Sequence, residues 1–226
     1  MLQSDCLAPG RVDIWVVTLA DISVVAEDML VSTEDRIHYT KIIPLRKKRN
    51  FAFRRSTLNF VLKQYVSEYK LVRSKNGKNY VKTGDGGNLI HFSASSSSNI
   101  CAIAVSTEKI GIDMQSRNLT VDMVGVCERF LPNFSQMKKW PRASHIQQMA
   151  MSAWCRIESL IKLRDHTLHA VLTEDDKSVS DWIHGYGHSD ILISDIDYLC
   201  AISQEHPFNI GNIYTFDYEQ ISRGYH

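Results

Sequence analysis

A carboxylate and an amide stand two residues apart at the end of an apolar segment in the middle of the chain. The segment reads KIGIDMQSRN (residues 109–118), and the two polar side chains belong to Asp113 and Gln115. Alternate residues of an extended strand point to the same face, so these two side chains are expected to enter one pocket. The spacing therefore predicts a polar pocket where a buried strand ends.

A second charged pair follows in WCRIESLIK, where Glu158 and Lys162 are four residues apart. On a helix these two residues share a face, and taken alone the spacing is typical of a surface ion pair. Together with Asp113, however, Glu158 supplies a second hard oxygen ligand, and the amide of Gln115 is a candidate third. Mg²⁺ is commonly held by one or two carboxylates, with phosphate oxygens and waters completing its octahedron.

The elements that must position these residues follow from periodicity and from turn and cap signals. The serine run SASSSS has two open interpretations, a flexible turn or a segment in which the hydroxyl of Ser95 or Ser96 donates to a phosphate. The predicted elements are a strand at 11–20, helices at 32–43 and 46–69, a hairpin around the NG within 73–89, a buried strand pair up to 106, helices at 121–131 and 143–164, and strands at 190–205.

Two apolar strand sequences resemble each other, NICAIAVS (99–106) and DYLCAISQ (197–204). Each lies some 40 residues after a long helix that is rich in cations. This weak internal similarity favours an α+β fold of two similar halves, although chance similarity between apolar strands would also account for it. The boundary is expected near residue 108, with an N-terminal subdomain at 1–108 and a C-terminal subdomain at 109–226.

Composition and charge exclude several classes of protein. The 226 residues carry 26 Lys and Arg against 25 Asp and Glu, so no overall field favours nucleic acid or membranes, although RKKRNFAFRR (46–55) holds six cations and no acid. The five cysteines include no CxxC pair, which favours a reducing compartment. With neither a secretory signal nor a membrane-spanning segment in view, we expect a cytoplasmic protein with no membrane or nucleic-acid partner.

The order and spacing of IGIDMQ and WCRIESLIK resemble the paired signature of the surfactin-type 4′-phosphopantetheinyl transferases, G-[IV]-D-x-E followed by W-x-x-K-E-x-x-x-K. The similarity covers most of the chain. RKKRNFAFRRSTLNFVL is similar to the basic N-terminal helix of the family, NGKN stands where the family has G-K-P, and HFSASSSSN stands where it has F-N-x-S-H-S-G.

The resemblance implies a role for each matching position. It implies that Asp113 and Glu158 bind Mg²⁺, with Gln115 in the place of the second acid, and that Glu158 helps to deprotonate the acceptor serine. The remaining matches are to residues that contact coenzyme A, namely Lys162, Arg55, Lys78 and Ser95, and Ser96 is a further candidate for a phosphate contact. Ser96 replaces the phosphate-binding His of the family, Ile157 replaces the Lys before the motif Glu, and Asn79 replaces the Pro of G-K-P.

The family resemblance also implies fold and activity. The fold would be the pseudo-dimeric one of this family, in a monomer, with coenzyme A in the cleft between two α/β subdomains. The protein would transfer the 4′-phosphopantetheine arm of coenzyme A to a serine of an acyl or peptidyl carrier protein and release 3′,5′-ADP. The alternative is a weakened or inactive pseudoenzyme that binds coenzyme A or a carrier protein, and a nucleic-acid binder that uses residues 46–55 ranks third.

Overall fold

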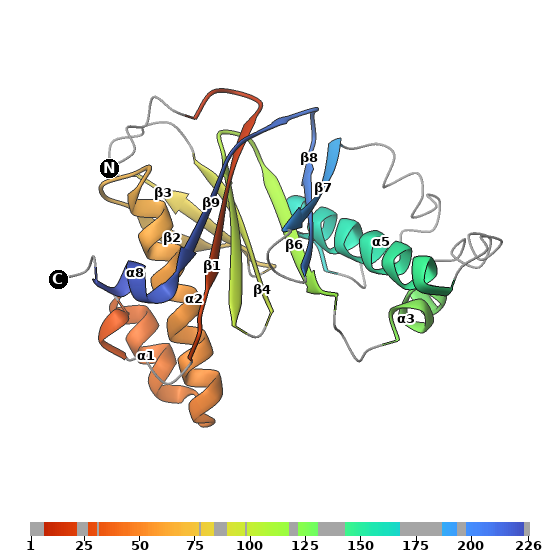
Figure 1. Ribbon diagram of the computed structural model, residues 1–226. Helices are drawn as coiled ribbons and strands as arrows, with labels where there is room; N and C mark the ends of the chain where they lie inside the picture. The colour runs from red at the N-terminus through yellow and green to blue at the C-terminus, as the bar shows by residue number, and fades with distance from the viewer. Residues whose placement is uncertain are drawn as a thin grey trace.

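The computed structural model describes residues 7–21, 27–30, 32–76, 78–83, 90–97, 99–117, 122–130, 143–167, 187–193 and 198–223. Strands form a four-stranded sheet, a three-stranded sheet and a two-stranded hairpin, with helices beside the two larger sheets (Figure 1). The predicted α+β class is confirmed. Within the described part of the chain, no helix is long and apolar enough to cross a bilayer.

The four-stranded sheet has the order β4-β5-β1-β9, in which only the β1–β9 pair is parallel. Its strands are β1 (Arg11–Thr18), β4 (His91–Ser97), β5 (Ile100–Ser106) and β9 (Asn209–Asp217). Helix α2 (Leu45–Lys63) covers one face, where Phe53 and Leu62 pack with Trp15 and Ile103. The other elements on this side are the 3₁₀ helix η3 (Glu27–Met29), α1 (Thr33–Lys41) and α8 (Tyr218–Arg223).

The three-stranded sheet has the order β6-β8-β7 and is antiparallel throughout. It consists of β6 (Ile110–Ser116), β7 (Gly187–Ile193) and β8 (Tyr198–Gln204), and it is accompanied by α3 (Met123–Phe130) and α5 (Ala143–Arg164). The order β7-β8-β6 repeats the order β4-β5-β1 of the first sheet. The two similar sequences form the two middle strands, β5 and β8.

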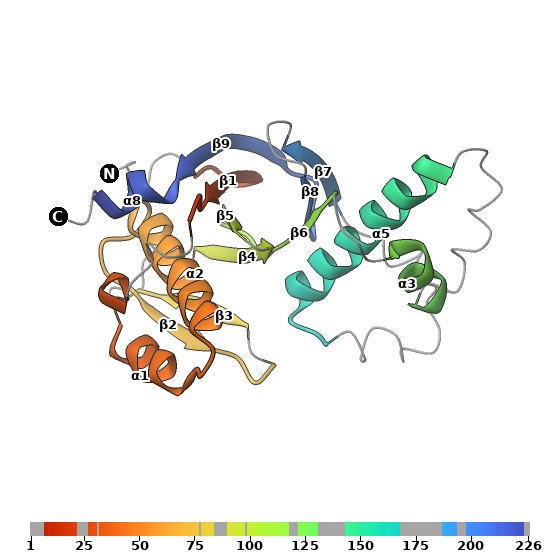
Figure 2. The same ribbon diagram turned by 60° about the horizontal axis from the view of Figure 1, so that its bottom comes forward.

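The two sheets share a hydrophobic core. Ile14 and Ala102 of the first sheet pack with Ile112 and Ile202 of the second, all at most 1% exposed. Helix α2 lies outside the first sheet and α5 outside the second, so the molecule has a helix–sheet–sheet–helix arrangement (Figures 1 and 2). The edges of β4 and β6 meet where the sheets approach.

Two features differ from the sequence prediction. The chain does not stay in the second half after residue 108, because β9 returns to pair with β1 and α8 follows it onto the α2 side. Strand pairing therefore crosses the predicted boundary between 1–108 and 109–226. The serine run is not a turn as far as it is described, because residues 93–97 continue strand β4 and pair with β5, while Ser98 lies outside the described residues.

The predicted hairpin is confirmed by the pairing of β2 (Lys70–Arg73) with β3 (Asn79–Lys82), although Gly77 of its turn is not described. The helix predicted at 143–164 is also confirmed. Of the cysteines, the four within the described residues are buried free thiols, and Cys6 is not described.

Candidate functional site

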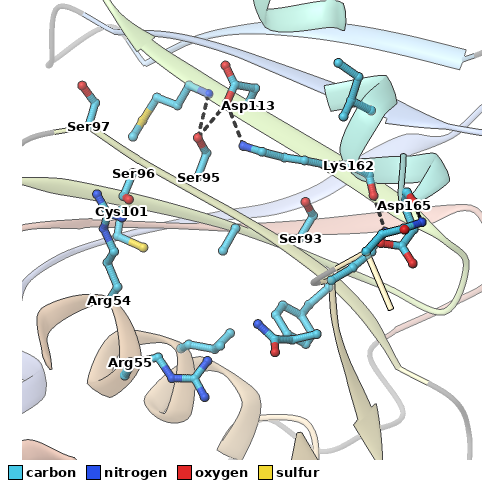
Figure 3. Close-up of a pocket in the computed structure, with 18 of the residues that line it drawn as sticks. Arg54, Arg55, Ser93, Ser95, Ser96, Ser97, Cys101, Asp113, Lys162 and Asp165 are labelled. Atoms are coloured by element: carbon cyan, nitrogen blue, oxygen red, sulfur yellow. Dashed lines mark hydrogen bonds and ion pairs between the residues drawn. The ribbon is translucent and has the colours of Figure 1, made fainter. Parts of the chain in front are cut away.

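A cavity of about 600 Å³ opens between the two halves of the molecule (Figure 3). Its walls come from α2, the β2–β3 turn, β4, β6 and the C-terminal end of α5. The charged side chains among its lining residues are Arg54, Arg55, Lys78, Asp113, Lys162 and Asp165. Four cations against two carboxylates favour an anionic ligand.

Asp113 lies on β6 at the wall of this cavity, and three side chains donate hydrogen bonds to its carboxylate. Lys162 Nζ and Ser95 Oγ donate to Oδ1 at 2.7 and 2.9 Å, and Gln115 Nε2 donates to Oδ2 at 3.0 Å. The predicted convergence of Asp113 and Gln115 on one pocket is therefore present, and both line the cavity. Only 5% of the Asp113 side chain is exposed, so its charge acts in a largely water-excluded place.

Serine hydroxyls connect β4 to the edge of β6. Ile112 N donates to Ser93 Oγ at 3.1 Å, and Met114 N donates to Ser95 Oγ at 3.2 Å. These N–H groups are buried, and the serine side chains satisfy them where a neighbouring strand would otherwise be needed. Ser95 thus holds the backbone of β6 and the carboxylate of Asp113 together. The sequence comparison assigned Ser95 to coenzyme A, and its hydroxyl already has these two protein partners.

Replacing Ser95 with Ala is expected to lower the free energy of unfolding by about 1–3 kcal/mol, because Met114 N and Asp113 would each lose a buried partner. Urea denaturation measures this loss. Ser96→Ala is the matched control on the same strand, where the side chain is only half-buried. Equal stability of the two variants would contradict the role of Ser95 in joining the strands.

Helix α5 packs on β6 so closely that only glycine fits at position 111. A Cβ atom on Gly111 would lie 1.8 Å from the backbone oxygen of Ser159 and 2.7 Å from Leu163 N. This close approach brings the neighbouring Glu158 and Lys162 to β6, where Lys162 Nζ also donates to Ile112 O at 3.0 Å. The close packing of α5 on β6 therefore explains why the IGID segment has glycine at position 111.

Glu158 is half-buried on α5 and is electrostatically coupled to the cavity. Burial raises the pKa of its carboxyl, the charge of Asp113 raises it further, and Lys162 opposes both effects. Among the described residues none donates a hydrogen bond to Glu158, and it does not line the cavity itself. The two predicted metal-binding carboxylates are thus close enough to repel each other.

The raised pKa of Glu158 predicts a pH-dependent instability. The folded state holds the Glu158 proton to a higher pH than the unfolded state, so stability falls as pH rises from about 4.5, the ordinary pKa, and levels off above the folded pKa. Glu158→Gln is expected to remove this fall. The difference in free energy of unfolding between variant and wild type, measured in urea at several pH values without metal, should grow in favour of Gln and then plateau. A difference in free energy of unfolding that does not change with pH would contradict this prediction.

Lys78 is committed to the backbone instead of facing the cavity with a free ammonium. Its Nζ donates to the carbonyl oxygens of Ile110 and Leu163, each at 3.3 Å, and to that of Lys162. The side chain thereby caps the C-terminal end of α5. Burial lowers the pKa of Lys78 to about 8, an effect that Asp165 opposes. The predicted contact to coenzyme A would require Lys78 to release these carbonyls.

Asp165 was not singled out in the sequence, and it joins the β2–β3 hairpin to α5. Its φ of 56° lies in the left-handed region, just after the helix ends. Ser74 Oγ and Tyr80 OH each donate to its carboxylate at 3.0 Å, and Asn76 Nδ2 donates to its carbonyl. An aspartate in this conformation after a helix is a known ending signal, but its partners lie some 90 residues away and no local sequence pattern identifies them.

The two arginines of α2 that line the cavity have different partners. Arg55 Nε donates to Asp35 Oδ1 of α1 at 2.7 Å, and this ion pair is only 15–20% exposed. Arg54 is exposed and has no hydrogen-bond acceptor among the described residues. Burial raises the pKa of the Cys101 thiol, and the charge of Arg54 opposes this effect. Figure 3 shows Arg54 directed toward Ser96 and Cys101. The family resemblance implied a role for Arg55 and none for Arg54.

The predicted site residues thus occupy one region. Arg55, Lys78, Ser95, Ser96, Asp113, Gln115 and Lys162 line the cavity. Glu158 adjoins it through its coupling to Asp113. No group of three His, Cys, Asp or Glu side chains in the described ranges has metal-binding geometry, since this set offers two carboxylates and an amide.

The arrangement is a buried Asp113 coupled to a half-buried Glu158, beside a cavity whose lining residues include four cations and two carboxylates, at the junction of two similar halves. Such a site suits a polyanionic ligand and a divalent cation. A comparison with protein-family models found no match, and a search of curated proteins found no significant one.

Proposed function

We propose that the protein is a 4′-phosphopantetheinyl transferase of the surfactin type, with the pseudo-dimeric fold of that family. The proposal rests chiefly on one observation: Asp113 and Glu158 are electrostatically coupled beside a cavity whose charged lining is four cations and two carboxylates. The sequence order and spacing of the two motifs agree with this geometry. The repeated strand order of the two sheets supports the family fold.

The donor set fits Mg²⁺. Oδ1 of Asp113 is occupied by two donors, but Oδ2 accepts only from Gln115 among the described residues and keeps a free lone pair. Asp113, Glu158 and the amide oxygen of Gln115 would hold the ion, and the repulsion that raises the pKa of Glu158 would be relieved. When bound, Mg²⁺ supplies charge neutralisation on the pyrophosphate.

In the proposed reaction the acceptor serine oxygen attacks the β-phosphorus of coenzyme A. The bond from that phosphorus to the bridging oxygen breaks, and 3′,5′-ADP leaves with the bonding electrons. The serine proton passes to the carboxylate of Glu158, whose raised pKa suits a general base. Lys162 and Arg54 contribute positive charge at the phosphates, since phosphoryl transfer depends on alignment and electrostatics.

The test is a mass measurement. The protein is incubated with coenzyme A, Mg²⁺ and an apo acyl or peptidyl carrier protein, and the carrier is expected to gain one phosphopantetheine arm. Glu158→Gln should abolish the gain while leaving the fold intact. A wild-type protein that modifies none of several carrier proteins would overturn the proposal.

A catalytically weakened homologue that binds coenzyme A or a carrier protein is the second candidate. It is favoured by the engagement of Lys78 with three backbone carbonyls and by a neutral Ser96 where the family has His. Restoring positive charge with Ser96→His is expected to tighten coenzyme A binding about tenfold, as measured by calorimetry near pH 6. Unchanged affinity would remove this explanation of weak binding.

The proposal extends to the cellular location, the oligomeric state and the partners of the protein. We propose that the protein acts as a cytoplasmic monomer, because the junction of its two halves already forms the site. A carrier protein and coenzyme A are its proposed partners. Analytical ultracentrifugation at catalytic concentrations tests the monomer.

A further inference from the structure

An apolar tip stands at the corner that joins α1 to α2. Ile43 is 92% exposed and Leu45 is 57% exposed, with an exposed Pro44 between them. Ile43 is the most exposed of the large hydrophobic side chains in the described part of the chain. In both overall views this corner lies at the end of the molecule far from α5 (Figures 1 and 2).

The tip lies within the most basic part of the chain. Residues 36–67 contain nine Lys and Arg and no acid, so the other 17 cations face all 25 acids and the rest of the chain carries a net charge of −8. Lys41, Arg46 and Lys47 beside the tip are exposed. The segment 36–67 therefore carries a formal charge of +9, although the net charge of the whole chain is only +1.

We infer that the α1–α2 corner docks on an anionic lipid surface. Moving exposed aliphatic side chains from water into the boundary between headgroups and acyl chains lowers the free energy. Neighbouring Lys and Arg side chains are attracted to anionic headgroups. Ile43 and Leu45 would enter this layer, with Lys41, Arg46 and Lys47 at the headgroups.

The apolar tip distinguishes this partner from other polyanions. A nucleic acid offers phosphates and stackable bases, and the tip presents neither aromatic nor amide side chains to them. From the sequence, the near-zero net charge and the absence of a predicted spanning segment argued against a membrane partner. Neither criterion tests a peripheral contact with a lipid surface. The inference is independent of the proposed transferase activity.

Sedimentation with lipid vesicles tests the inference. Binding to vesicles with about one third phosphatidylserine is expected to be at least about tenfold tighter than to phosphatidylcholine alone. The double variant Ile43→Ser/Leu45→Ser should lose at least about tenfold in this binding, with an unchanged melting temperature. The matched control Val72→Ser/Ile213→Ser removes exposed side chains elsewhere, 42% and 50% exposed, and should bind as wild type does.

Three outcomes would overturn the inference. The first is equal binding to the two kinds of vesicle. The second is loss of binding in Arg46→Ser/Lys47→Ser with full binding in Ile43→Ser/Leu45→Ser, because cations alone would then explain the attraction. The third is that a single-stranded oligonucleotide binds more tightly than the anionic vesicles and displaces them, which would assign the corner to nucleic acid.

Discussion

Replacing Asp113 with Asn is expected to lower phosphopantetheine transfer by about a thousandfold or more. Asn keeps the size of the side chain and one acceptor oxygen, but it removes the charge that the proposed Mg²⁺ site needs. It also leaves the ammonium of Lys162, 2.7 Å from Oδ1, without its counter-ion. The initial rate of carrier-protein modification, followed by mass spectrometry at saturating coenzyme A, measures the effect.

Gln115→Ala is the matched control for this prediction. The side chain of Gln115 lies on the same strand and donates to the same carboxylate, at 3.0 Å from Oδ2, but it carries no charge. Its loss is expected to reduce the rate far less than Asp113→Asn does. If Asp113→Asn keeps wild-type activity, the carboxylate has no part in the reaction and the proposed mechanism fails.

Gly111→Ala is expected to lower the free energy of unfolding by about 3 kcal/mol or more. The new Cβ would stand 1.8 Å from the backbone oxygen of Ser159, and no rotamer change can separate them, because the backbone fixes the position of a Cβ. Relief requires α5 to move away from β6. The free energy of unfolding by urea measures the cost.

The same displacement should also impair the site. Glu158 and Lys162 flank Ser159 on α5, so moving the helix separates both side chains from Asp113. Gly10→Ala is the control, because Gly10 has a φ of +72° but no atom within 4 Å of an added Cβ. It should cost only about 1–2 kcal/mol, from its left-handed backbone, and leave activity unchanged. Equal losses for the two variants would contradict the steric role of Gly111.

Local sequence signals determined most of the secondary structure. A helix was expected to start with Ser32 or Thr33 as its cap, and the hydroxyl of Ser32 accepts from Asp35 N at 3.0 Å. The helical periodicity at 143–164 and the β-branched run at 11–20 correspond to α5 and β1. These signals act over three or four residues or along one face of an element. Helices and strands can therefore be predicted from them without knowledge of the fold.

The pairing of strand β9 could not be predicted from local sequence patterns. Its sequence NIGNIYTFD alternates, with Tyr214 and Phe216 half-buried against the core under α2, and this pattern was available. Its partner was not, because β9 pairs in parallel with β1 nearly 200 residues earlier. A strand at the end of the second half that completes the first sheet cannot be assigned from neighbours in sequence.

The sequence by itself determined the chemistry of the candidate site: which carboxylates belong together, their spacing on a strand and a helix, and the glycine beside them. Only the tertiary structure decided how each polar side chain is used. Ser95 binds the edge of β6, Lys78 caps α5, Arg55 pairs with Asp35, and Arg54 is left facing the cavity. Residue type fixes what a side chain can donate or accept, whereas its partner depends on which distant backbone the packing brings within 3 Å.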